Sequence, residues 1–234
     1  MAADTRDLAA PRSAVAQTAE AFGDCSIAIA NAGVQSDAPL VEMGDETWST
    51  VIDVNLIRVR VNFPASRQRS SRPARLKRSG SAGKFTRMRM TGSAHTLRAA
   101  LPGVYEAGHG RVVVIPSTFG RSGSPERTND CTSKWGLIGL TKAAAPEAGP
   151  KGVTVNAVAP TAVRSGLLGG PPEEGTEAFK GMVEALNEYN AIPVGLMAPE
   201  DIADGVVFLC TPAAKHISGV CLDVAAGHNA KYTG

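Results

Sequence analysis

Residues 129–137 of this 234-residue chain read NDCTSKWGL and place a carboxylate and an amine one helical turn apart. Asp130 and Lys134 stand at the front of a helical apolar pattern, so their side chains share one face of the predicted helix. Such a pair is either an acid/base centre or an exposed salt bridge. Asp has an ordinary pKa of about 3.9, and a neighbouring cation lowers it. We therefore expect Asp130 to be ionised at neutral pH without a proton to donate, which favours the salt bridge.

The elements that must position this pair alternate along the chain. Short apolar, β-rich runs predict strands at 26–33, 111–117, 153–160 and 220–224. Amphipathic or capped segments predict helices at 8–22, 45–56, 131–148, 173–189 and 200–210. This alternation predicts an α/β fold, with a parallel sheet covered by helices on both faces. Such sheets bind ligands at the carboxyl ends of their strands.

One window does not follow the alternation. Residues 57–90 contain eleven Lys and Arg residues, no Asp or Glu, and no helical or strand periodicity. We expect this window to be a basic, disordered insertion within one domain that spans residues 1–234. The flanking segments 45–56 and 91–107 would join into one amphipathic helix if the window were removed.

Composition excludes several classes of protein. The net charge is +2, and no apolar run is long enough to cross a membrane. The four cysteines show no C-x-x-C spacing, and the histidines show no ligand spacing, so we expect no metal site. The beginning, MAADTRD, has no apolar leader region, so we expect a cytoplasmic protein.

Five short motifs occur in a characteristic order: NAG at 31–33, VNL at 54–56, STFG at 117–120, SK at 133–134 and NAVAPTAV at 156–163. Together they resemble the short-chain dehydrogenase/reductase family, single-domain Rossmann enzymes that transfer a hydride between NAD or NADP and an alcohol or ketone. The segments 190–210 and 216–227 resemble its carveol-dehydrogenase-like, actinobacterial branch.

The resemblance implies roles for four residues at the reaction centre. Lys134 matches the lysine that holds the nicotinamide ribose and lowers the pKa of a catalytic tyrosine. Ser117 matches the serine that positions the substrate oxygen, and Asn55 matches the asparagine of a proton relay. Asp130 occupies the tyrosine position. A short, ionised Asp is a poor proton donor there, so the resemblance implies an impaired catalyst.

The resemblance also implies a set of cofactor contacts for NAD or NADP. They are Asp4, Asn31, Ala32, Gly33, Lys134, Pro160, Val163 and Ser165. No glycine-rich T-G-x-x-x-G-x-G loop is present, and the first βαβα segment of the family has no counterpart. We therefore expect weak cofactor binding. Family members form homo-oligomers, which suggests contacts through the helices at 91–107 and 131–148.

Three functions remain open at this point. The first is an oxidoreductase that acts on a small-molecule alcohol or ketone with reduced activity. The second is a non-catalytic remnant of the family, or a gene-model artefact with a spurious insertion. The third is a protein that binds nucleic acid through the basic window 57–90, which we rank below the other two because such windows are often solvated.

Overall fold

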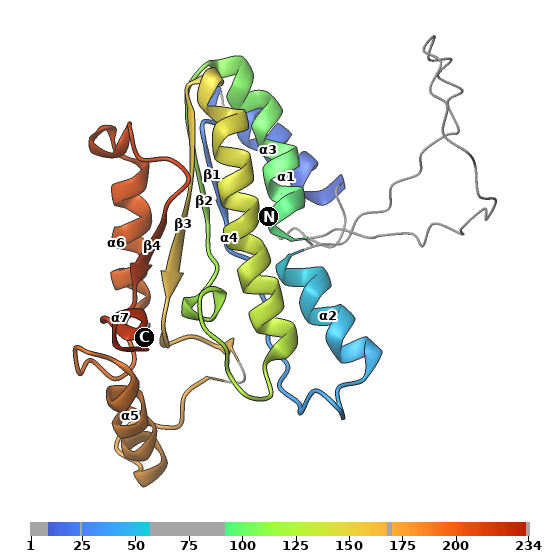
Figure 1. Cartoon of the computed structure of the whole chain (residues 1–234). Helices are drawn as coiled ribbons and strands as arrows, with labels where there is room; N and C mark the ends of the chain where they lie inside the picture. Colours follow the sequence, from blue (N-terminus) through green and yellow to red (C-terminus); the bar gives the residue numbers. More distant parts are fainter. Residues whose placement is uncertain (1–8, 24, 57–91, 168–169, 233–234) are drawn as a thin grey trace, which may run out of the picture.

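The computed structural model describes residues 9–23, 25–56, 92–167 and 170–232. These residues form a layered α/β arrangement (Figure 1). The proposed insertion at 57–90 and the proposed cofactor contact Asp4 lie outside the described residues.

A parallel sheet forms the centre of the described residues. Its strands are β1 (Ile27–Ala30), β2 (Gly110–Val114), β3 (Val153–Pro160) and β4 (Cys221–Val224), in the spatial order β1-β2-β3-β4. All three pairings are parallel, with Ala30 opposite Val114, Val114 opposite Ala157, and Ala157 opposite Cys221. The predicted α/β fold is confirmed. Because the strands are parallel, their carboxyl ends lie at one edge of the sheet.

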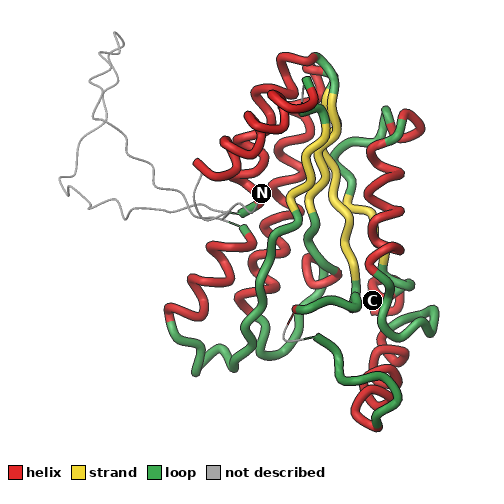
Figure 2. Tube along the Cα trace, turned by 180° about the vertical axis from the view of Figure 1, so that it is seen from behind, coloured by secondary structure: helices red, strands yellow, loops and turns green. Residues whose placement is uncertain are grey.

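Helices cover both faces of the sheet (Figures 1 and 2). One layer contains α1 (Ala9–Phe22), α2 (Asp45–Asn55), α3 (Ser93–Ala107) and α4 (Thr128–Ala148), with α3 against β1 and β2 and α4 against β3. The helix α6 (Pro199–Cys210) packs on the other face, against β2, β3 and β4. The helices α5 (Glu177–Tyr189) and α7 (His228–Tyr232) complete the C-terminal part.

Alternating side chains of the strands enter two separate cores. Val112 and Val155 point towards α3 and α4, where they pack with Leu97 and Leu137. Val158 and its neighbours on the opposite face pack against α6. This alternation follows from the two-residue period of a strand, and it explains why continuous valine runs form buried strands here.

The α6 layer leaves one end of the sheet uncovered. Ile27 and Ile29 of the edge strand β1 are 49% and 48% exposed, whereas Ala28 and Ala30 between them are buried. Ile27 and Ile29 point to the face of the sheet on which α6 packs, and α6 covers β2, β3 and β4 there but does not cover β1.

The segments on either side of 57–90 meet in space. Gly92 has a φ of 78°, and a Cβ added there would lie 2.0 Å from the backbone oxygen of Val54. Ser93 Oγ, at the start of α3, donates to the backbone oxygen of Asn55 at 3.3 Å. Gly92 immediately precedes α3, and its positive φ is not helical. The segments α2 and α3 are therefore two separate helices, and Gly92 forms a corner beside the end of α2.

Candidate active site

Asn55 is the centre of a hydrogen-bond network at the carboxyl ends of the strands. Its Oδ1 accepts from the backbone N–H of Val34 at 2.7 Å, and its Nδ2 donates to the Val34 oxygen at 3.0 Å. The same Nδ2 also lies within donor distance of Asp130 Oδ1 (3.2 Å) and Ser133 Oγ (3.1 Å). Asn55 is completely buried, so these contacts replace the water that its amide would otherwise bind. The network ties the loop after β1 to α2 and to the beginning of α4.

The beginning of α4 is fixed by its own side chains. The predicted start of this helix at residue 131 placed Asp130 just before it. The helix instead starts at Thr128, so Asp130 lies in its first turn. Asn129 Oδ1 accepts from the backbone N–H of Asp130 at 2.7 Å, and Asn129 Nδ2 donates to the Ser36 oxygen at 3.0 Å. Ser133 Oγ donates to the Asp130 backbone oxygen at 2.7 Å. These bonds fix the backbone of Asp130 in the first turn of α4.

The prediction that Asp130 and Lys134 form an exposed salt bridge is wrong. Asp130 is only 4% exposed, and its carboxylate faces the Asn55 amide. Among the ion pairs between described residues, none joins Asp130 to Lys134 within 4.0 Å. The two charges still act on each other at longer range.

The expected direction of the Asp130 pKa shift is also wrong. Burial raises the pKa of the Asp130 carboxyl, and the nearby Lys134 and Arg127 cations offset this only in part. Burial lowers the pKa of the Lys134 ammonium, and the Asp130 charge opposes this. The sequence pattern showed the attraction between the two groups but not the loss of water around them, which is the larger effect.

Lys134 reaches the loop that follows β1. A Cβ added at Gly33 would lie 3.6 Å from Lys134 Nζ and 3.4 Å from Asn55 Oδ1. The backbone of Gly33 is exposed, and Lys134 is partly buried. The Gly33 backbone therefore packs beside both the Asn55 amide and Lys134 Nζ.

Ser117 lies three residues beyond the end of β2. Its backbone is extended, and its Oγ accepts from the Phe119 N–H at 3.3 Å in the short helix η1 (Thr118–Gly120). This turn lies directly against α4, since a Cβ added at Gly120 would be 2.9 Å from the Lys134 backbone oxygen. Ser117 and Lys134 thus come from two elements that contact each other at the same edge of the sheet.

The proposed cofactor contacts lie on two loops at this edge. Asn31, Ala32 and Gly33 are exposed on the loop after β1. Pro160 ends β3, and Val163 beyond it forms an isolated parallel bridge with Met197. The exposed Ser165 accepts at its Oγ from the Leu167 N–H at 3.3 Å. Apart from Asp4, the structure therefore places these residues at the strand ends that sequence analysis indicated.

Sequence analysis missed an aromatic group beside Ser117. The Phe119 ring packs edge-on against His228, with ring centroids 6.5 Å apart, and His228 stacks on Tyr189 at 6.0 Å. The Arg127 guanidinium lies 5.3 Å from the centre of the Phe119 ring. Asn129 was also missed. No short-range sequence signal identifies these residues, because their contacts join η1, α4, α5 and α7.

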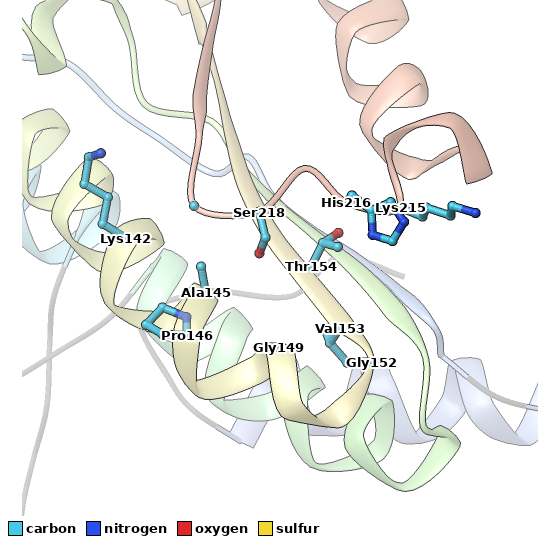
Figure 3. Close-up of a pocket in the computed structure, with 11 residues that line it drawn as sticks. Lys142, Ala145, Pro146, Gly149, Gly152, Val153, Thr154, Lys215, His216 and Ser218 are labelled. Atoms are coloured by element: carbon cyan, nitrogen blue, oxygen red, sulfur yellow. The ribbon is translucent and has the colours of Figure 1, made fainter.

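A separate cavity of about 500 Å³ lies at the other end of β3 (Figure 3). It is lined by Ala145 and Pro146 at the end of α4, by Gly149 just after that helix, by Val153 and Thr154 of β3, and by loop residues that include Ser218. Because β3 begins at Val153 and the Asn55 network lies beyond its opposite end, this cavity is not part of the candidate active site.

The described residues contain no cluster of three or more His, Cys, Asp or Glu side chains that could hold a metal ion. None of the helices in the described part of the chain is long and apolar enough to cross a membrane.

The fold and the strand-end site define a Rossmann-like α/β protein, and comparisons with known proteins agree. Residues 74–229 match the family model described as enoyl-(acyl carrier protein) reductase. A 3-oxoacyl-[acyl-carrier-protein] reductase of Rickettsia felis is 32% identical over 86% of this chain and 66% of the relative. An uncharacterised NAD-dependent oxidoreductase of Mycobacterium tuberculosis is also 32% identical, over 96% of this chain and 70% of the relative.

Solved structures show the same relationship. The carveol dehydrogenase of Mycobacterium avium in complex with NAD superimposes with a TM-score of 0.76 at 28% identity, over 96% of this chain and 72% of that one. A putative short-chain alcohol dehydrogenase of Sinorhizobium meliloti gives a TM-score of 0.75 at 25% identity, over 98% and 75% of the two chains. The chain belongs to the short-chain dehydrogenase/reductase family. It spans about two thirds of the length of the curated relatives it matches.

Proposed function

We propose that this chain is an NAD- or NADP-dependent oxidoreductase that acts on a small alcohol or ketone, with its rate limited by Asp130. The observation that carries the proposal is the placement of Asp130 and Lys134 around the buried Asn55 amide, at the carboxyl ends of the strands. The NAD-dependent relative of M. tuberculosis and the NAD complex of carveol dehydrogenase support the cofactor class.

The residues at this edge fit the nicotinamide end of such a cofactor. The loop 31–33 is exposed, and its Gly33 lies next to Lys134 Nζ. Asn31, Ala32, Gly33, Lys134, Pro160, Val163 and Ser165 would hold it. When bound, the cofactor supplies or accepts the hydride.

The chain's own groups would orient and protonate the substrate. Ser117 Oγ already accepts from the Phe119 N–H, so its O–H can donate to a substrate oxygen. Burial favours the protonated form of Asp130, which can then act as an acid. The carboxyl group is much shorter than a phenol, and it is held back by Asn55, so proton transfer to an oxygen at Ser117 would be inefficient.

The test compares the wild-type chain with Asp130→Tyr and Asp130→Asn in ketone reduction, followed by NADH or NADPH absorbance. Asp130→Tyr should raise kcat about 10²–10⁴-fold, because a positioned acid contributes about that factor. Asp130→Asn removes the acid at nearly constant volume and should lower any residual rate. Nicotinamide fluorescence measures cofactor binding separately. No binding by any of the three proteins would refute the proposal and support a non-catalytic role.

A further inference from the structure

The cavity at the beginning of β3 lies where a loop replaces a strand at the edge of the sheet. The strand β4 pairs with β3 only from Ala157 onwards, so within the described residues the first half of β3 has no strand on that side. The loop before β4 binds there instead: Ser218 Oγ accepts from the Val155 N–H at 3.2 Å, and the Gly219 N–H donates to the Val155 oxygen at 2.8 Å. The volume of about 500 Å³ is typical of a small-molecule site.

A buried hydroxyl group without a hydrogen-bond partner lines this cavity. Thr154 is 7% exposed, and its Oγ1 has no partner among the described residues. Figure 3 shows this oxygen directed towards the side chain of His216, which also lines the cavity. Buried hydroxyl groups are usually paired, because an unpaired one costs free energy. A ligand in the cavity supplies the acceptor that Thr154 lacks.

A second unpaired donor lies next to Thr154 in the sheet. Arg111 of β2 is opposite Thr154 in the parallel register, so both side chains point to the same face of the sheet. Arg111 Nη1 donates to the Gly110 oxygen at 2.9 Å, but the buried Nε has no partner in the described part of the chain. A guanidinium and a hydroxyl group on neighbouring strands are donors that suit an oxyanion.

The walls of the cavity combine positive charge with an apolar side. Lys142, Lys215 and His216 line it, and its lining includes no Asp or Glu. The ion pairs between described residues involve neither of these two lysines, and both side chains are exposed and free to turn towards an anion. Ala145 and Pro146 of α4 form the apolar side. These walls suit a molecule with an anionic group and a small organic part.

We propose that this cavity binds a small phosphate monoester. The phosphate group accepts hydrogen bonds from Thr154 Oγ1 and the basic side chains around it, while the organic part lies against Ala145 and Pro146. A phosphate monoester carries three acceptor oxygens and about two negative charges at neutral pH, which matches the number of basic groups better than a carboxylate does. The site is separate from the strand-end site, and its occupation requires no nicotinamide cofactor.

The experiment titrates the full chain with phenyl phosphate in a calorimeter, without cofactor. Phenyl phosphate should bind saturably at one site, and phenol, which lacks the phosphate group, should bind at least about tenfold more weakly. Thr154→Val keeps the shape of the side chain and removes the hydroxyl, so it should weaken the binding of phenyl phosphate about tenfold or more. Thr154→Ser keeps the hydroxyl and should bind as the wild type does.

Two lysine variants locate the bound phosphate. Lys215→Ala removes a cation of the cavity and should weaken binding several-fold. Lys180→Ala is the matched control, because Lys180 is bound to Glu177 on α5 at 2.7 Å and does not line the cavity, so its loss should leave the affinity unchanged. Circular dichroism shows whether each variant is folded. Thr154→Val should unfold at no lower temperature than the wild type, since it loses only an unpaired hydroxyl.

Three results would overturn the inference. The first is no saturable binding of phenyl phosphate by the folded wild-type chain. The second is equal affinity of the wild type and the folded Thr154→Val variant, which would place the ligand elsewhere on the chain. The third is binding of phenol as tight as that of phenyl phosphate, which would show that the cavity selects the apolar part rather than the phosphate group.

Discussion

The Asn55 side-chain amide lies 3.2 Å from the Asp130 carboxylate, although 75 positions separate the two residues in the chain. The contact joins the end of α2 to the first turn of α4. Asn55 also binds the backbone of Val34, which links the loop after β1 to both helices. A single buried amide therefore sets the relative positions of three segments that form the candidate active site. Its removal should affect the fold as well as the chemistry.

Asn55→Ala should lower the free energy of unfolding by about 3 kcal/mol. The change removes the Asn55 partner from both the N–H and the C=O of the partly buried Val34, and each such group costs about 1–3 kcal/mol when it is not otherwise satisfied. Urea denaturation followed by circular dichroism measures the effect. Asn187→Ala is the matched control, because Asn187 accepts one bond, from the Gly195 N–H at 2.7 Å, and should cost about 1 kcal/mol. Equal losses in both variants would contradict the central role of Asn55.

Two glycines of α4 should respond in opposite directions to the same substitution. A Cβ at Gly136 would lie 2.3 Å from Leu56 Cδ2, so Gly136→Ala must displace the buried Leu56 side chain at the end of α2. We expect it to destabilise the fold by about 1–3 kcal/mol, the usual cost of overpacking. A Cβ at Gly139 meets nothing within 4 Å, so Gly139→Ala should stabilise the helix by about 0.5–1 kcal/mol.

Thermal denaturation of both single variants measures these changes on one helix and with one type of substitution. Stabilisation by Gly136→Ala would show that Leu56 and α4 are not in contact as described. That result would contradict the packing of α2 against α4 that places Asn55 next to Asp130.

The strands and the residue types at their ends followed from the sequence because they depend on local pattern. Valine runs such as 112–114 predict buried strands, and parallel strands place Ser117 and the loop 31–33 at one edge without further information. The protonation preference of Asp130 did not follow. Its spacing to Lys134 indicated attraction, whereas the removal of water depends on α2 and the loop after β1, which pack over it from elsewhere in the chain. The roles of Asn129 and Phe119 are likewise products of tertiary contact.

The corner at Gly92 gives a prediction about the join between α2 and α3. Gly92→Ala places a Cβ 2.0 Å from the Val54 oxygen at a residue with φ of 78°, which is strained for any side chain. The free energy of unfolding should fall by more than about 2 kcal/mol, since strain of this kind alone costs about 1–3 kcal/mol.

Gly103→Ala within α3 serves as the control for Gly92→Ala. A Cβ there has open space and should raise the unfolding free energy by about 0.5–1 kcal/mol. Urea denaturation measures the free energy of unfolding of both variants. An unchanged stability in Gly92→Ala would mean that α2 and α3 do not meet at this corner.

Asp130→Asn should become more stable relative to the wild type as the pH rises above about 4. The folded-state pKa of Asp130 is raised from 3.8, mainly by burial. A raised pKa means that the stability contributed by this group is fully present below 3.8 and is lost as the pH rises through the folded-state value. The asparagine variant has no charge to bury and avoids this loss, while it keeps an oxygen that can accept from Asn55 Nδ2.

Each unit of the shift in the Asp130 pKa corresponds to about 1.4 kcal/mol of unfolding free energy. Urea titrations of both proteins between about pH 4 and 8, the range in which a raised carboxyl pKa would act, measure the difference. A constant difference across this range would show that Asp130 is ionised in the folded chain, as the sequence pattern alone suggested. It would also remove the acid on which the proposed reduction depends.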